Sequence, residues 1–307
     1  MNEQNDNFFF EHNYPAHFTT SDKMRIFFIT NFPHNNQENT KNLPTLIFNY
    51  GLVCSNAHWQ HQIAFFSKQG YDIIVHDYRG HYSSGTISNM AKDATFIKIV
   101  NDIYELLSHL KRTRIVMFGH SMGVNISLQF ALTHPEMLEK LVLISGSIIS
   151  PDEIMMDSHI VTYLRPTLKF ISDCFPGATE ELWSNAFMNP LIKKGVHLGG
   201  FNTKKVSTQF VELYLKRIGQ LSPQLFFQLF QEMHDHKIAT ELSSITPPSL
   251  IIAGDQDKVI PLHVQTLLQK KLPKAELYLV RNGSHVPQAD FPETINEKIL
   301  RFLTVPS

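Results

Sequence analysis

The chain has 307 residues, a length that accommodates one large α/β domain or two domains of average size. Hydrophobic residues make up 43% of it and charged residues 18%, which supports a sizeable core and excludes an intrinsically disordered protein. The formal net charge of -1 argues against the concentrated basic surface that a nucleic-acid partner requires.

Cys54 and Cys174 are the only two cysteines, which is too few for a disulfide framework. We expect free thiols in a reducing compartment, although a single bridge between them stays open. Residues 1–22 lack the positive segment and apolar run of a secretory signal, and no apolar stretch is long enough to span a membrane. These features predict a cytoplasmic protein and leave open whether it forms a homo-oligomer.

Short β-branched runs alternate with helical periodicity along most of the chain. This alternation is typical of a mostly parallel sheet flanked by helices. In chain order, the predicted strands cover residues 17–20, 25–31, 45–49, 72–76, 114–119, 141–145, 249–254 and 277–280. The predicted helices include residues 96–110, residues 122–133 and a closing helix with one apolar face formed by Ile295, Ile299 and Phe302.

Residues 147–243 interrupt this alternation, because they show helical periodicity without a convincing strand. A segment of this length between two strands is too long for a plain loop. It also contains more aromatic side chains than a solvent-exposed segment would, namely Phe170, Trp183, Phe187, Phe210, Phe226, Phe227 and Phe230. We therefore predict a core of residues 1–146 and 244–307, with residues 147–243 as a helical lid packed over the sheet.

The strongest chemical signal is Gly119-His120-Ser121-Met122-Gly123, which has the G-x-S-x-G pattern of a nucleophile elbow. It lies between a predicted strand and a predicted helix, where that motif must lie. The turn is so tight that a side chain at either glycine would collide with neighbouring backbone. Ser121 is therefore the predicted nucleophile, with the amino end of the following helix directed at the developing oxyanion.

A serine hydroxyl is a weak nucleophile and needs a base, which in turn needs a carboxylate to orient it. His285 is the candidate base, because it follows the last predicted strand in a loop that Gly283 allows to be tight. Asp257 is the candidate acid, since it follows the strand over residues 249–254, and Asp255 is a weaker alternative. The order Ser, Asp, His along the chain is that of α/β-hydrolases.

On these residues the chain resembles the α/β-hydrolase superfamily, in its lidded branch of esterase-like and C–C-hydrolase-like proteins. Beside the elbow, the resemblance lies in residues 49–52 leading into Trp59, in residues 77–81 and in residues 248–261. It implies an α/β fold with a mostly parallel central sheet. It also implies that the backbone amides of Leu52 and Met122 form the oxyanion hole.

The chain departs from the family pattern at two positions. Tyr50 stands where the family usually has His before the oxyanion-loop glycine, so this loop is expected to sit differently. Tyr82 stands where a glycine usually follows Gly80, which implies either an altered turn or a tyrosine covering one edge of the site.

Other chemistry-bearing residues have weaker support. We interpret His120 as structural, leave His58 between pocket lining and a surface position, and consider Cys54 a poor nucleophile candidate. His234 and His236 resemble a metal pair, but residues two apart do not share a helix face, so a solvated lid helix is the better interpretation. No metal or cofactor is implied.

These observations together predict a carboxylesterase-like serine hydrolase that cleaves an ester, thioester or lactone of a small substrate through an acyl-enzyme. The apolar lid favours an apolar substrate. C–C bond cleavage and acyl transfer use the same triad and stay open. A non-catalytic ligand-binding protein of the same fold is a further alternative, because a fold does not determine a function.

Overall fold

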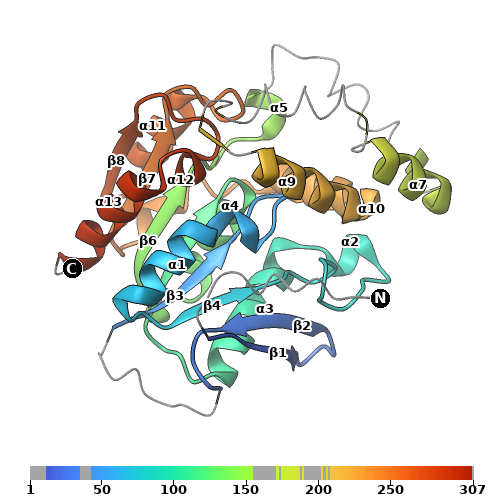
Figure 1. Cartoon of the computed structure of the whole chain (residues 1–307), viewed down its shortest axis with the longest axis horizontal. Helices are drawn as coiled ribbons and strands as arrows, with labels where there is room; N and C mark the ends of the chain where they lie inside the picture. Colours follow the sequence, from blue (N-terminus) through green and yellow to red (C-terminus); the bar gives the residue numbers. More distant parts are fainter. Residues whose placement is uncertain are drawn as a thin grey trace.

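The computed structural model describes residues 12–34, 43–154, 171–172, 174–186, 189, 202, 205–206 and 208–305. Its centre is an eight-stranded sheet with the strand order β1-β2-β4-β3-β5-β6-β7-β8 (Figure 1). β2 is antiparallel to both its neighbours, and all other neighbouring strands are parallel. The strands are β1 (Tyr14–Thr19), β2 (Arg25–Thr30), β3 (Thr45–Asn49), β4 (Ile73–His76), β5 (Ile115–His120), β6 (Leu138–Ile144), β7 (Ser249–Gly254) and β8 (Ala275–Val280).

The predicted α/β fold with a mostly parallel sheet is confirmed. β3 and β7 have the predicted bounds, while β1 and β6 begin at Tyr14 and Leu138, earlier than predicted. Every residue of β3, β4, β5 and β7 is buried, as expected for strands covered on both faces. β1 and β8 lie at the edges, and all their side chains except that of Val280 are exposed or half-buried, so their apolar pattern is weaker.

The strand order determines which helices share a face, because crossovers between parallel strands are right-handed. The chain moves from β3 to β4 in one direction across the sheet, and from β4 to β5 and β5 to β6 in the other. The helix after β3 therefore lies on the opposite face from the helices before and after β5. These helices are α1 (Gln60–Gln69), α3 (Phe96–His109) and α4 (Met122–Thr133), with the short η1 (Asn56–Trp59), α2 (Met90–Asp93) and η2 (Pro135–Met137) between strands.

The helices at the carboxyl end of the chain complete the two layers. α11 (Leu262–Lys271) contacts both β7 and β8, while α12 (Pro287–Asp290) and α13 (Pro292–Thr304) contact α1 (Figure 1). The predicted closing helix corresponds to α13, in which Ile295 and Ile299 are buried. No helix in the described ranges is both long enough and apolar enough to cross a bilayer. Cys54 and Cys174 are free thiols, the first buried and the second exposed.

The described part of residues 147–243 contains helices and no strand. The helices are α5 (Pro151–Ile154), α7 (Pro176–Ala186), α9 (Thr208–Gln220) and α10 (Pro223–Asp235), followed by η3 (Leu242–Ser244). α7 contacts α9 and α10, and α10 also contacts α2 and α5. Phe170 and Phe187, which contributed to the prediction of a lid, lie outside the described residues, so the lid boundaries stay a prediction.

A buried ion pair anchors the turn after β4 to α3. The Arg79 guanidinium is 2% exposed and donates to the two Asp102 carboxylate oxygens at 2.7 and 2.5 Å. Asp22, in the turn between β1 and β2, also accepts from Arg79 at 3.3 Å and from the half-exposed Lys98 at 2.7 Å. Since a buried cation is costly without a partner, Asp102 holds the turn after β4 to α3. Asp22 links both to the edge of the sheet through Arg79 and Lys98.

We expect Asp102→Ala to lower the free energy of unfolding by about 3 kcal/mol, because it leaves the buried Arg79 without its main partner. Lys98→Ala, which removes a surface ion pair from the same cluster, is expected to cost less than about 1 kcal/mol. Urea denaturation of both variants measures the difference. Equal losses would contradict a structural role for the buried pair.

Candidate active site

The strand order reverses at the middle of the sheet, and this reversal locates the site. From β3 the chain crosses to β4 on one side, and from β5 it crosses to β6 on the other, while β3 and β5 pair directly. The loops leaving β3 and β5 therefore diverge to opposite faces. Ligands of open α/β sheets bind in the crevice that such a divergence leaves at the carboxyl ends of the strands.

Ser121 lies at this point, between the last residue of β5 and the first residue of α4. Its backbone has φ 54° and ψ -121°, a conformation that L-residues rarely adopt and that functional sites often contain. The turn is held because the Ser121 amide donates to the Ile144 carbonyl of β6 at 3.0 Å. The structure thus places Ser121 on a strained strand-to-helix turn, as the elbow motif predicts.

Two glycines make room for this turn. A Cβ on Gly119 would lie 2.6 Å from the Gly123 carbonyl oxygen, and one on Gly123 would lie 2.2 Å from the Asn49 carbonyl oxygen. Both distances are far below a normal contact, and in both cases the obstacle is backbone. The close approach of α4 to the ends of β3 and β5 therefore requires glycine at both positions.

The structure brings Asp257 and His285 together from the loops after β7 and β8. Nδ1 of His285 lies 2.9 Å from Oδ2 of Asp257, and the Asp257 side chain is 2% exposed. Because a carboxylate only accepts hydrogen bonds, Nδ1 carries the proton, and Nε2 of the neutral ring is left as the basic nitrogen. This is the tautomer that a general base for Ser121 needs.

Asp257 rather than Asp255 reaches the histidine, since Asp255 is exposed at the end of β7. The other Asp257 oxygen accepts the amides of Val259 and Ile260 at 2.8 and 2.9 Å, which fixes the carboxylate plane. Burial raises the pKa of Asp257, but the His285 ring and these two amides outweigh it, so the pKa lies below its usual value. The carboxylate therefore stays charged at neutral pH.

The loops that carry Asp257 and His285 are joined through their backbones. The Gln256 amide donates to the Gly283 carbonyl at 2.9 Å, and a Cβ on Gly254 would lie 2.3 Å from the Gly283 and Ser284 carbonyl oxygens. The sequence analysis did not identify Asp290, whose buried carboxylate accepts the Ser284 amide at 2.6 Å and so shapes the loop before His285. No sequence motif identifies this contact, because it joins the loop before His285 to the last residue of the short helix α12.

His120, inside the elbow, links the nucleophile turn to the base. Its ring is fully buried, and Nε2 donates to the His285 carbonyl oxygen at 2.9 Å. Burial lowers the pKa of His120 well below its usual value, so the ring is neutral and Nδ1 carries no proton. This contact agrees with the structural interpretation of His120 and ties the residue before Ser121 to the backbone of His285.

The loop after β3 lies directly beside the nucleophile. A Cβ on Gly51 would lie 3.0 Å from the Ser121 Cβ, so Leu52 follows a residue in contact with the elbow. Tyr50 is fully buried and accepts the Tyr78 amide at 3.0 Å, while the Tyr78 hydroxyl donates to the Tyr50 carbonyl at 3.0 Å. The tyrosine that replaces the usual histidine thus connects this loop to the turn after β4.

Tyr82 has a left-handed backbone with φ 37°, and its hydroxyl donates to the Cys54 carbonyl at 2.6 Å. Arg217 of α9 lies over its ring, with the guanidinium carbon 4.9 Å from the ring centre. A left-handed backbone is also what a glycine at this position would adopt, so an altered turn and a tyrosine covering one edge of the site both stay predictions. The turn takes the left-handed form, and the side chain lies between the loop after β3 and α9.

The burial of the remaining candidate residues shows which of their predicted roles the structure allows. The Cys54 thiol is buried and its pKa is raised to about 12, which keeps it protonated and unreactive. His58 is 2% exposed, so the surface alternative for it is wrong. The interpretation of a solvated helix is wrong for His236, because its ring contacts Asn125 and Gln129 of α4. Within the described ranges, no group of three or more potential metal ligands is gathered.

α9 lies against the base loop. The Asn202 side chain donates to the Asn282 carbonyl at 2.8 Å, just before His285 in the chain. Val286 and Ala289, on the other side of His285, form a separate apolar cluster with Val206 and with residues of α9. Those residues are Val206, Phe210, Val211, Leu215 and Ile218.

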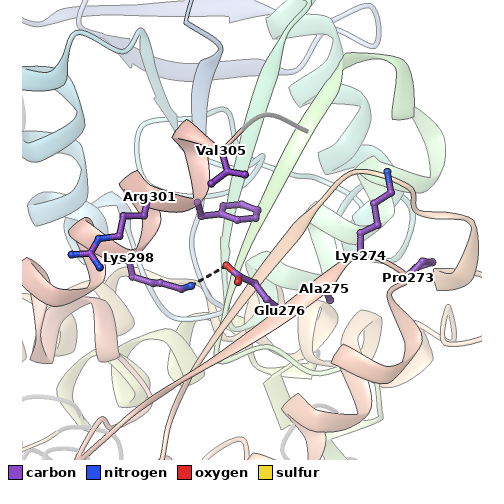
Figure 2. Close-up of a pocket in the computed structure, with 8 residues that line it drawn as sticks. Pro273, Lys274, Ala275, Glu276, Lys298, Arg301 and Val305 are labelled. Atoms are coloured by element: carbon purple, nitrogen blue, oxygen red, sulfur yellow. Dashed lines mark ion pairs between the residues drawn. The ribbon is translucent and has the colours of Figure 1, made fainter.

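A pocket of about 440 Å³ lies elsewhere, at the amino end of β8 (Figure 2). Pro273, Ala275, Arg301 and Val305 are among its lining residues, and the Lys298–Glu276 ion pair crosses it at 3.1 Å. Asp257 and His285 follow the carboxyl ends of β7 and β8, so this pocket is at the opposite end of the strands from the site.

The profile of the α/β-hydrolase fold family matches residues 44–292. The chain belongs to the α/β-hydrolase family. Among characterised proteins, Protein ABHD8 of Mus musculus is 26% identical over 262 residues, which cover 84% of this chain and 54% of that protein. The chain thus spans about half the length of this relative.

Two other similarities cover nearly the whole of the similar protein. The putative carbamate hydrolase RutD of Agrobacterium fabrum is 25% identical over 270 residues, which cover 85% of this chain and 93% of RutD. An esterase from Exiguobacterium antarcticum superimposes with a TM-score of 0.74 at 18% identity, covering 95% of this chain and all of the esterase. At that identity the superposition shows a shared fold.

We expect Gly123→Ala to destabilise the protein by about 2 kcal/mol or more, because the new Cβ would collide with the Asn49 carbonyl of β3. Gly219→Ala is the matched control, since a Cβ on Gly219 of α9 would lie 3.5 Å from its nearest neighbour, the Ser184 carbonyl oxygen, which is an ordinary contact distance. Thermal unfolding of both variants measures the effect. A Gly123→Ala protein as stable as the control would contradict the close approach of α4 to β3.

Proposed function

We propose that the protein is a serine hydrolase that cleaves a carboxylic ester or a related acyl bond, such as a thioester or lactone. The observation that carries the proposal is the Asp257–His285 pair at 2.9 Å, placed at the same end of the sheet as the strained turn of Ser121. Esterase-like and carbamate-hydrolase-like relatives agree with hydrolysis as the reaction.

In the proposed reaction, Ser121 Oγ attacks the carbonyl carbon and its proton passes to Nε2 of His285. Asp257 stabilises the imidazolium that results. The tetrahedral intermediate then collapses, the bond to the leaving group breaks, and His285 returns the proton to the leaving oxygen or sulfur. A water molecule, deprotonated by His285, attacks the acyl-enzyme and releases the acid.

Leu52 and Met122 are the proposed oxyanion-hole donors. Neither backbone amide has a hydrogen-bond acceptor among the described residues. For Met122 this is expected, because the first amides of a helix have no partner within the helix. Two amides already fixed by the elbow and by the loop after β3 can stabilise the oxyanion without reorganising during the reaction.

The side chains that α9 places next to the loop of His285 are mostly apolar, which favours a substrate with an apolar part. Phe210 and Val211 are buried beside Val286 in the cluster next to the base loop. Hydrophobic linings of this kind are usual for small-molecule sites. No observation favours C–C bond cleavage or acyl transfer over hydrolysis, because both use the same three side chains.

We expect a fluorophosphonate probe to label the protein covalently at Ser121, because the probe reacts only with an activated serine. Ser121→Ala is expected to abolish labelling, whereas Ser108→Ala, which removes an exposed hydroxyl of α3, leaves it unchanged. Gel fluorescence and mass spectrometry of the labelled peptide provide the measurement. Labelling that is absent or independent of Ser121 would favour the binding-protein alternative.

The same wild-type and Ser121→Ala preparations, assayed on ester, thioester, lactone and carbamate substrates, identify the bond that is cleaved. Turnover that disappears in the variant is attributable to the elbow serine. A series of p-nitrophenyl esters from acetate to octanoate then tests the apolar preference, which a constant kcat/KM along the series would contradict.

We expect Asp257→Asn to reduce kcat by about 10³- to 10⁴-fold, because an amide favours the wrong tautomer of His285 and cannot stabilise the imidazolium. Asp255→Asn, two residues earlier and exposed, is the matched control and should leave kcat nearly unchanged. Steady-state kinetics on the best substrate make the comparison. An equal loss in both variants would assign the acid to neither residue.

The stability of the wild type and that of Asp257→Asn should also depend differently on pH. Since the pKa of Asp257 is lowered by folding, its charge stabilises the fold above its ordinary pKa of about 4, and this contribution disappears as the pH falls further. The difference in unfolding free energy between wild type and Asp257→Asn should therefore stay constant from pH 8 to pH 5 and shrink below about pH 4.

A further inference from the structure

His58 is a buried polar side chain that the reaction steps do not use. It lies in η1, seven residues after Gly51 along the loop that follows β3, and only 2% of it is exposed. Neither Nδ1 nor Nε2 has a hydrogen-bond partner, among the residues that the structure describes. The Ser55 carbonyl accepts the His58 backbone amide at 3.1 Å and lies close enough to the ring to favour its protonated form.

The neighbours of the ring place it between the elbow and the lid. It stacks on the His120 ring with centres 5.9 Å apart and an interplanar angle of 20°. On other sides it meets Phe210 and Tyr214 of α9 edge-on, each with ring centres 5.2 Å apart. The imidazole is therefore enclosed by one residue adjacent to Ser121 and by two aromatic rings of the helix that contacts the base loop.

An imidazole in this setting is uncharged. Burial lowers its pKa to about 3, and the Ser55 carbonyl offsets only part of that effect. A neutral imidazole has one N–H donor and one acceptor nitrogen. A buried donor or acceptor without a partner costs about 1–3 kcal/mol, so two unpartnered nitrogens would be a persistent cost to the fold unless an outside group satisfies them.

We propose that His58 is a specificity-determining residue that hydrogen-bonds a neutral hydroxyl or carbonyl group of the substrate, beside the scissile bond. The inference rests on the proposed function, because the site it describes is that of Ser121. The rings of His120, Phe210 and Tyr214 surround the His58 imidazole with flat surfaces, so that His58 is the hydrogen-bonding group among them. Such surroundings suit an otherwise apolar ester or lactone with a hydroxyl or carbonyl substituent, and they offer no charge for an ionic group.

The uncharged ring also separates this role from that of the base. His285 has a carboxylate partner at Nδ1, as a residue that must become an imidazolium requires. His58 has no carboxylate partner, and the neighbouring His285 itself disfavours a charge on it. It is therefore suited to hydrogen bonding and unsuited to proton transfer.

The test compares substrates that differ by one hydroxyl group. One arm places the group on the acyl side, with p-nitrophenyl 3-hydroxybutyrate against p-nitrophenyl butyrate. The other places it on the alcohol side, with 3-hydroxybutyl butyrate against butyl butyrate, followed by acid release. We expect the wild type to prefer the hydroxylated member of one arm about 10-fold in kcat/KM, since one hydrogen bond to a buried group is worth about that much.

The diagnostic variant is His58→Phe, which keeps an aromatic ring and removes both hydrogen-bonding nitrogens. It should lower the preference to near unity by slowing the hydroxylated substrate more than the plain ester, while the unfolding temperature is unchanged or higher. His58→Gln, which keeps a donor and an acceptor, should restore part of the preference. His61→Phe, on the exposed side of α1, is the matched control and should behave as the wild type.

The outcomes separate the two proposals. If a buried water alone satisfies the ring, the preference is the same in wild type and His58→Phe, and the inference about His58 is overturned while Ser121-dependent turnover persists. A His58→Phe protein that unfolds, together with a His58→Gln protein that has lost all preference, would assign His58 to the fold. Absence of Ser121-dependent labelling and turnover would overturn the proposed function and this inference with it.

Discussion

The contact between the start of α4 and the ends of β3 and β5 determines the geometry of the whole site. Because a Cβ on Gly123 would lie 2.2 Å from the Asn49 carbonyl, the helix begins as close to the sheet as backbone atoms allow. That approach leaves Ser121 only a left-handed turn, with its amide bonded to β6. The backbone conformation of the elbow is thus imposed by the packing of α4 against the sheet.

The other parts of the site are held relative to this turn by short-range contacts between loops. His120 donates to the His285 carbonyl, so the elbow itself positions the backbone of the base. Gly254 allows the loops after β7 and β8 to touch, which brings Asp257 to the same histidine. The three candidate catalytic side chains come from three strand ends, and the sheet register fixes the separation of those ends.

Helix α9, which lies in the predicted lid, contacts two of the loops around Ser121. It packs against Val286, next to the base, and its Phe210 and Tyr214 enclose His58 on the loop after β3. A single helix therefore borders both the loop of the base and the loop proposed to hold the oxyanion.

The sequence by itself determined the fold class, the elbow and the order of its partners, because these depend on local patterns. The alternation of apolar strands and periodic helices, the two glycines around Ser121 and the loops after β7 and β8 are all visible in consecutive residues. Only the tertiary structure decided that Asp257 rather than Asp255 meets His285 and that His120 holds the loop of His285. It also decided that His58 is buried, with no hydrogen-bond partner for its ring nitrogens among the described residues. These features depend on contacts between loops distant in the chain, and a sequence pattern with a period of two or 3.6 residues carries no information about them.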